Sequence, residues 1–244
     1  MHFDSNTKAM IKRLTYLFFF LLVLIPCFSS CAQITDDNND TTIKVSSFNI
    51  LHGATTTGDF DLDKIAKVII DADPDFVALQ EVDYKTNRAK KYDLASELGW
   101  RSKMTALFGR AMYYDDGEYG EAILSKHSII NSRNVALPAN KGDEPRAALE
   151  ITIVLPSKDT ISFIGTHLDH LKAEQNRINQ AKKIIEAFQN NTHPTILAGD
   201  LNAQPVSQTM SILQKKWTVS YDKDKVEPTF PSNDPKFKID YVLF

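Results

Sequence analysis

The chain has 244 residues, with 28 Lys and Arg against 31 Asp and Glu, and its formal net charge is −3. No stretch is rich in Lys or Arg, and this acidic balance argues against a protein that binds DNA broadly through clustered cations. Both cysteines, Cys27 and Cys31, lie in the N-terminal segment. The rest of the chain therefore has no thiol for disulfides, redox chemistry or soft metals.

The N-terminal segment is typical of an export signal. Lys12-Arg13 precedes an apolar stretch over residues 14–28, which is shorter than the ~20 apolar residues that span a bilayer. Phe28-Ser29-Ser30-Cys31 resembles a bacterial lipobox, which would make Cys31 a lipidated first residue. We therefore expect residues 1–31 to be a signal peptide of an exported lipoprotein in a Gram-negative cell envelope, on the outer membrane or a membrane facing the periplasm. The alternative is an ordinary cleaved signal in which Cys31 has no role.

Residues 32–42 are rich in Asp and Asn and indicate a solvated tether, followed by a single domain over residues 43–244. In this domain Asp61 is placed to cap a helix that Pro74 ends, and the short apolar run 76–79 predicts a strand buried on both faces. Further strands are predicted at 43–50, 122–124, 129–137, 147–155, 161–165, 195–198 and 239–244, and further helices at 92–98, stopped by Gly99, and through Ile178 to Phe188. These elements favour an α/β (α+β) fold, a four-layer sandwich of two mixed β-sheets flanked by helices.

Short polar motifs stand where several of these apolar runs end. Each offers a hard oxygen ligand or a proton-handling side chain at the start of a loop. The motifs are Ser47-Phe48-Asn49, Leu79-Gln80-Glu81, Gly165-Thr166-His167, Gly199-Asp200-Leu201-Asn202 and Ile239-Asp240-Tyr241. Together they predict a divalent-metal site for attack on a phosphate ester.

Asp200 and Asn202 form the most specific of these motifs. Gly199 permits a tight turn after the strand, and the alternation of side chains places Asp200 and Asn202 on one side with Leu201 toward the core. The alternative interpretation is an Asx turn at a strand end, which needs no chemistry.

The order of the motifs resembles the endonuclease/exonuclease/phosphatase superfamily, from about Val45 to Phe244. The segments that carry the resemblance are Phe48-Asn49-Ile50-Leu51-His52-Gly53, Asp75-Phe76-Val77-Ala78-Leu79-Gln80-Glu81-Val82-Asp83, Thr86-Asn87-Arg88, Glu118-Tyr119-Gly120-Glu121-Ala122-Ile123-Leu124-Ser125, Thr166-His167-Leu168-Asp169-His170 and Gly199-Asp200-Leu201-Asn202. The branch is more similar to bacterial relatives of sphingomyelinases and of glycolipid-anchor remodelling proteins than to DNA-repair endonucleases.

The resemblance implies a role for each motif residue. Asn49 and Glu81 match the family's ligands of Mg²⁺ or Mn²⁺, and hard amide and carboxylate oxygens suit these ions. His167 matches a phosphate-contacting position, and Asp200 matches the Asp that orients or deprotonates the attacking water. Asn202 matches a residue that binds phosphate oxygens or metal. Asp240 matches an Asp that orients the catalytic His.

Five residues have less certain roles. Arg146, and Arg177 with Gln180 one turn later, are either supporting residues near the phosphate or surface charges. We expect His170 either to contact the site residues without touching the substrate or to have a structural role only. Glu121 stands where many relatives carry Asn, and an added carboxylate there would repel phosphate or recruit a second cation.

The resemblance also implies a Ser-Asp-His segment and a final strand that do not follow Asp240 in this sequence. On that basis we expect feeble hydrolysis, because loss of a general acid–base group typically costs ~10²–10⁴ in rate. We also expect the strand that ends at Phe244 to lack a sheet neighbour. A truncated gene model, a frameshifted pseudogene and a degenerate binding protein are the competing explanations.

The function these observations favour is metal-dependent hydrolysis of phosphate esters, by a phosphodiesterase at the cell envelope that acts as a monomer. A lipid anchor would hold it at the membrane, and a lipid headgroup or nucleic acid would supply the phosphate ester. The alternatives are a nuclease of the same superfamily and a non-catalytic binding lipoprotein.

Overall fold

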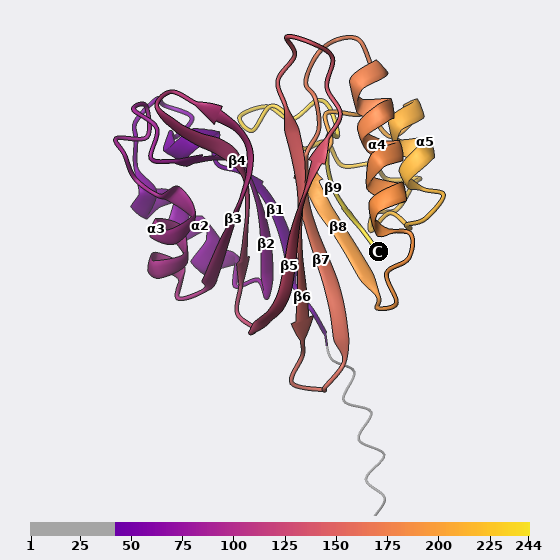
Figure 1. Cartoon of the computed structure of the whole chain (residues 1–244), viewed down its shortest axis with the longest axis horizontal. Coiled ribbons are helices and arrows are strands. Elements are labelled where there is room, and N and C mark those ends of the chain that lie inside the picture. The colour runs from indigo at the N-terminus through magenta and orange to yellow at the C-terminus, as the bar shows by residue number, and fades with distance from the viewer. Residues whose placement is uncertain (1–41) are drawn as a thin grey trace, which may run out of the picture. The chain divides into compact units, whose positions relative to one another are not determined.

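The computed structural model describes residues 42–244, which form two mixed β-sheets packed face to face (Figure 1). One sheet has the strand order β1-β2-β4-β3 and the other has the order β5-β6-β7-β8-β9. The strands are β1 (Val45–Asn49), β2 (Phe76–Tyr84), β3 (Thr105–Tyr114), β4 (Gly117–Ser125), β5 (Ile129–Leu137), β6 (Arg146–Val154), β7 (Thr160–His167), β8 (Thr195–Asp200) and β9 (Asp240–Leu243).

Helices cover the outer face of each sheet, which confirms the predicted four-layer sandwich (Figure 1). Apolar side chains of α2 and α3 pack on β2 and β4, and those of α4 and α5 pack on β7, β8 and β9. The helices are η1 (Leu51–Gly53), α2 (Leu62–Ala72), α3 (Leu94–Ser102), α4 (Gln175–Phe188) and α5 (Gln208–Leu213). As predicted, the Asp61 carboxylate caps α2 by accepting the backbone N–H of Lys64.

The layer between the sheets is apolar and tightly closed. Phe76 of β2 and Phe163 of β7 are fully buried there, with ring centroids 5.4 Å apart. Gly165 of β7 marks the closest approach, because a Cβ at this position would lie 3.2 Å from Ile123 and 3.3 Å from Ala78. A side chain at position 165 would therefore push the sheets apart at the level just below the site described in the next section.

Several boundaries differ from the sequence-based prediction. The predicted strand at 76–79 is the first part of the longer strand β2, and that at 122–124 lies near the end of the longer strand β4. Gly99 does not stop α3, which continues to Ser102. Its role is packing, because a Cβ there would lie 2.8 Å from the Cβ of Ala106 in β3. Strand β3 and the short helix α5 were not predicted.

The expectation that the last strand lacks a neighbour is wrong. β9 pairs with β8 on one side, and the segment around Val219 pairs with it on the other. Thr218 donates its N–H to the Phe244 carbonyl at 2.7 Å, and Phe244 donates back to Thr218 at 2.9 Å. A loop segment therefore covers this edge of the sheet and satisfies its backbone groups.

The predicted signal peptide 1–31, Cys31 and tether residues 32–41 lie outside the described residues. Among residues 42–244, no helix combines the length and the apolar character that a membrane crossing requires.

Candidate active site

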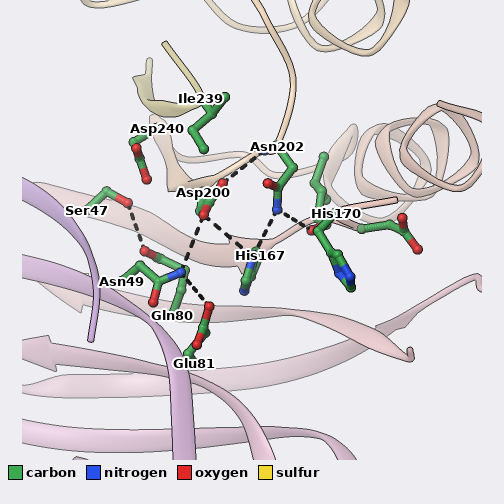
Figure 2. A network of polar contacts seen from close by, with 12 residues as sticks. Ser47, Asn49, Gln80, Glu81, His167, His170, Asp200, Asn202, Ile239 and Asp240 are labelled. Atoms are coloured by element: carbon green, nitrogen blue, oxygen red, sulfur yellow. Dashed lines mark hydrogen bonds and ion pairs between the residues drawn. The ribbon is translucent and has the colours of Figure 1, made fainter. Parts of the chain in front are cut away.

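The predicted motifs meet at one rim of the sandwich because four of their strands run as parallel pairs. β1 runs parallel to β2 in one sheet, and β7 runs parallel to β8 in the other. β1 also contacts β8 and β9 across the sandwich. The carboxyl ends of these strands therefore open into a single pocket, lined by Asn49, Glu81, His167, Asp200, Asn202 and Asp240 (Figure 2).

Asn49 joins the two sheets at the floor of this pocket. Its amide Nδ2 lies 2.9 Å from Glu81 Oε1 and 3.4 Å from Asp200 Oδ2, so it donates toward carboxylates of both sheets (Figure 2). Its Oδ1 accepts the backbone N–H of Leu51 at 3.0 Å. One amide and two carboxylates thus converge on a small space.

Local backbone strain aims the polar side chains into the pocket. Glu81 has φ = 57° and sits at a shift in the β2–β4 register between Leu79 and Val82. Such a bulge turns a side chain away from the regular alternation of the strand. His52 and Asn202 also have left-handed backbones, with φ of 44° and 46°. Non-glycine residues rarely adopt this conformation, and it is concentrated at functional sites.

His167 is buried and neutral. Burial and the neighbouring Arg146 cation lower its pKa to about 3. Its Nδ1 lies 3.3 Å from Arg146 NH1, and its Nε2 lies at the polar end of β8. That nitrogen lies 3.6 Å from Asp200 Oδ2 and 3.0 Å from Asn202 Nδ2. The ring is therefore oriented between a cation and the polar end of β8.

The carboxylates in the pocket are crowded and have divergent pKa values. Burial, followed by the nearby Asp240 charge, raises the pKa of Asp200 to about 7. Burial also raises the pKa of Asp240, against a hydrogen bond from Thr229. Burial opposes the ionisation of Glu81 too, but His52 and Asn49 outweigh it and lower its pKa to about 2. Glu81 is thus ionised at neutral pH while Asp200 is close to its midpoint.

Two of the less certain candidates lie at the pocket. Arg146 is 2% exposed and lines it, with NH1 2.9 Å from Glu144 Oε1 and 3.3 Å from Tyr119 Oη. Its NH2 lies 3.2 Å from His170 Nδ1, and His170 also lines the pocket. Arg146 is therefore a buried guanidinium held by several side chains at the pocket wall.

Arg177 does not reach the pocket. Its guanidinium donates to the backbone carbonyls of Asp169 (2.9 Å) and Leu171 (2.5 Å). Gln180 accepts the backbone N–H of Asp169 and donates to the Pro138 carbonyl. The prediction that Arg177 supports the phosphate site is therefore wrong. Arg177 instead holds the loop that carries His170.

The predicted site residues do not include several that line the pocket. His52 lies with its Nδ1 3.4 Å from Glu81 Oε2, and the left-handed backbone at Leu51 and His52 turns it inward. Tyr119 and Glu144 complete the wall around Arg146. His52 and Tyr119 stand within segments that carry the family resemblance, but the resemblance implies no role for them.

Comparison with known proteins agrees with this geometry. The profile of the "Endonuclease/Exonuclease/phosphatase family" matches residues 46–244. The chain belongs to this family. Its members hydrolyse phosphoester bonds and generally use divalent metals. No curated protein matches the chain significantly.

Three solved structures illustrate the shared fold. The mannosyl-6-phosphatase Bt3783 of Bacteroides thetaiotaomicron has a TM-score of 0.64 and 19% identity, over 83% of this chain and 85% of that chain. The human Nocturnin catalytic domain, with bound sulfate, has a TM-score of 0.63 and 21% identity, over 82% of each chain. Sphingomyelinase C of Streptomyces griseocarneus has a TM-score of 0.58 and 20% identity, over 82% of each.

As pH rises, Asp200 lowers the stability of the folded protein and His167 raises it. The pKa of Asp200 is raised from 3.8 to about 7, so its contribution is fully present below pH 4 and is lost as pH rises through about 7. The pKa of His167 is lowered from 6.5 to about 3, so its contribution is present above pH 6.5 and is lost as pH falls through about 3. The two contributions largely offset each other between pH 4 and 6.5.

Asp200→Asn should remove the Asp200 contribution and leave that of His167. We expect the melting temperature of the variant, measured in EDTA, to rise relative to the wild type as pH increases from 4 to 7. Each kcal/mol of change in the free energy of unfolding shifts the melting temperature by about 2–4 °C for a domain of this size. Asp159→Asn, at an exposed turn, is the matched control and should show a constant difference. A constant difference for Asp200→Asn as well would contradict the raised pKa.

Proposed function

We propose that this chain is a divalent-metal-dependent phosphodiesterase that acts on lipid-headgroup phosphodiesters at the cell envelope. The observation that carries the proposal is the convergence of Asn49, Glu81 and Asp200 beside the donors His167, Asn202 and Arg146. Such a pocket offers hard oxygen ligands for a cation and N–H groups for phosphate oxygens.

The residues present fit Mg²⁺ or Mn²⁺. Within residues 42–244, no group of three or more His, Cys, Asp or Glu side chains has metal-binding geometry. Mg²⁺ commonly uses one or two carboxylates and completes its coordination with water and substrate oxygens. Asn49 and Glu81 would hold the ion. Burial and then the Asp240 charge raise the pKa of Asp200, and a cation would offset that negative charge. The bound ion would polarise the phosphate and lower the pKa of water.

The protein's own residues supply binding and proton transfer. Arg146, Asn202 and His167 line the pocket and would contact the non-bridging phosphate oxygens, where charge develops during attack. Asp200 would accept the proton of the attacking water, because its carboxylate reaches the floor of the pocket beside Asn49. The neutral state of His167 fits a donor role.

The walls of the pocket support a diester that carries an apolar group. Leu51, Val68 and Phe230 are apolar residues that line the pocket with 42%, 52% and 51% of their surfaces exposed. Arg88 also lines the pocket, and its guanidinium lies 4.5 Å from the centre of the Tyr114 ring. The lining thus offers both apolar surface and a cation to a substituent of the phosphate. Among the structures of the same fold, sphingomyelinase C carries the name of an enzyme acting on a phospholipid.

Glu81→Gln tests the metal site. We expect hydrolysis of bis-(p-nitrophenyl) phosphate to require Mg²⁺ or Mn²⁺ and to fall at least ~10²-fold in the variant, which loses an ionised ligand. Glu118→Gln is the control, because Glu118 lies on the neighbouring strand and pairs with Arg110 at the surface. Metal-independent turnover, or equal losses in both variants, would contradict the proposal. Binding of phosphate and metal without turnover would favour a binding lipoprotein.

The envelope location rests on Cys31, which the sequence places in a lipobox. We expect the protein expressed with its leader in a Gram-negative host to sediment with membranes, and Cys31→Ser to move it to the soluble periplasmic fraction. Cys27→Ser, inside the apolar stretch, is the control and should leave the membrane fraction unchanged. Retention of Cys31→Ser in the membrane would show that lipidation of Cys31 is not the anchor.

A further inference from the structure

Glu121 is an unexplained acid directly beneath the pocket. It is 0% exposed, and neither carboxyl oxygen has a hydrogen-bond partner in the part of the chain that the structure describes. An unpaired carboxyl in a protein interior is costly, and a native structure rarely keeps one without a reason. Glu121 does not line the pocket, so it is not placed to repel a bound phosphate or to hold a second cation there.

The position of Glu121 follows from the alternation of side chains along β4. Tyr119, Glu121 and Ile123 share the face toward the second sheet, and Ile123 belongs to the apolar layer between the sheets. Tyr119 lines the pocket, so Glu121 lies one step deeper than the pocket wall. Its pairing partner on β3 is Gly109, where a Cβ would lie 3.1 Å from Leu149 of β6. Glycine at that position lets Asn134 of β5 and Leu149 of β6 approach β3 closely.

Arg146 also has a buried polar atom that lacks a hydrogen-bond partner. Its terminal nitrogens contact Glu144, Tyr119 and two histidine rings, but its Nε–H has no hydrogen-bond partner among the described residues. Burial of Glu121 raises its pKa well above the usual range, and the Arg146 cation is the main opposing influence. Arg146 and Glu121 are therefore close enough to interact, although no ion pair joins them in the described region.

We propose that Glu121 is a positioning residue that holds the inner side of Arg146 through one buried water, which accepts from the Arg146 Nε–H and donates to the Glu121 carboxyl. A donor and an acceptor that are both buried and lie beyond direct contact are the groups that an ordered water bridges. The link fixes the plane of the guanidinium and keeps its NH1 and NH2 edge toward the pocket. The proposal rests on the function proposed above, in which Arg146 binds the phosphate.

The uncharged form of Glu121 suits this role. A second carboxylate beneath Arg146, added to Glu144, would cancel the positive charge that attracts a phosphate. A neutral carboxylic acid hydrogen-bonds the bridging water without removing that charge. The direction of the pKa shift agrees with this state. Glutamine would then replace Glu121 with little change, whereas leucine would fill similar space and offer no polar atom.

Two substitutions test the role in binding. In Glu121→Gln, we expect the KM for bis-(p-nitrophenyl) phosphate and the inhibition constant of inorganic phosphate to stay within about 3-fold of the wild type. In Glu121→Leu, we expect both constants to rise about 10-fold with a smaller change in kcat, because a ground-state contact to phosphate is lost. The Leu variant should remain folded, since leucine fills similar space, and its melting temperature checks this. Unchanged constants in a stable Leu variant would overturn the proposal.

A second readout does not depend on turnover. In ¹H–¹⁵N spectra of arginine side chains, with the Arg146 signal assigned by Arg146→Lys, the Nε–H of Arg146 should exchange slowly with water in the wild type and in Glu121→Gln. In Glu121→Leu it should exchange at least 10-fold faster or change its shift. Glu118→Leu, on the same strand and at the surface, should leave it unchanged. An unchanged Arg146 signal in Glu121→Leu would refute the link even if the chain hydrolyses diesters, and a wild type without turnover would refute only the proposed function.

Discussion

The close packing of the two sheets determines the rest of this structure. Gly165, Ala78 and Ile123 let β7 approach β2 and β4 so closely that one added carbon at Gly165 would meet both neighbours. Above this contact the parallel strands of each sheet end at one rim, and residues separated by as many as 151 positions, such as Asn49 and Asp200, come within 3.4 Å. The polar pocket is thus a direct consequence of apolar packing one layer below it, in keeping with the general position of sites at the carboxyl ends of parallel strands.

The pocket concentrates features that oppose stability. Asp200 and Asp240 are buried acids with raised pKa values, and Glu121 is an acid without a hydrogen-bond partner among the described residues. Glu81 and His52 occupy left-handed backbone conformations. In the capped helix α2 and the apolar layer between the sheets, by contrast, sequence preference and structure agree. The gathering of buried acids and left-handed backbones at one rim indicates that function, not folding, accounts for these residues.

The sequence predicted the fold class and the residues at the strand ends, because both depend on local patterns. A buried apolar run followed by a polar residue places Asn49, His167 and Asp200 at strand ends, whereas Glu81 sits at a bulge inside β2. The sequence did not predict β3, whose half-exposed surface has no clear alternation of apolar and polar residues. It implied no role for His52 and Tyr119, and it misplaced Arg177, because their positions depend on a backbone turn or on contacts between distant segments. Gly99 was read as a helix stop, although it serves the packing of α3 on β3.

We propose that Asn49 and Glu81 hold a divalent cation at the rim where the sheets meet. The most direct test is the anomalous scattering of Mn²⁺ in crystals of the protein soaked with MnCl₂ and inorganic phosphate. We expect an anomalous peak at bonding distance from Glu81 Oε and Asn49 Oδ1. Phosphate should lie between the ion and the side chains of His167, Asn202 and Arg146. A fully soaked crystal with no peak there, or with Mn²⁺ bound only at carboxylates outside the pocket, would contradict it.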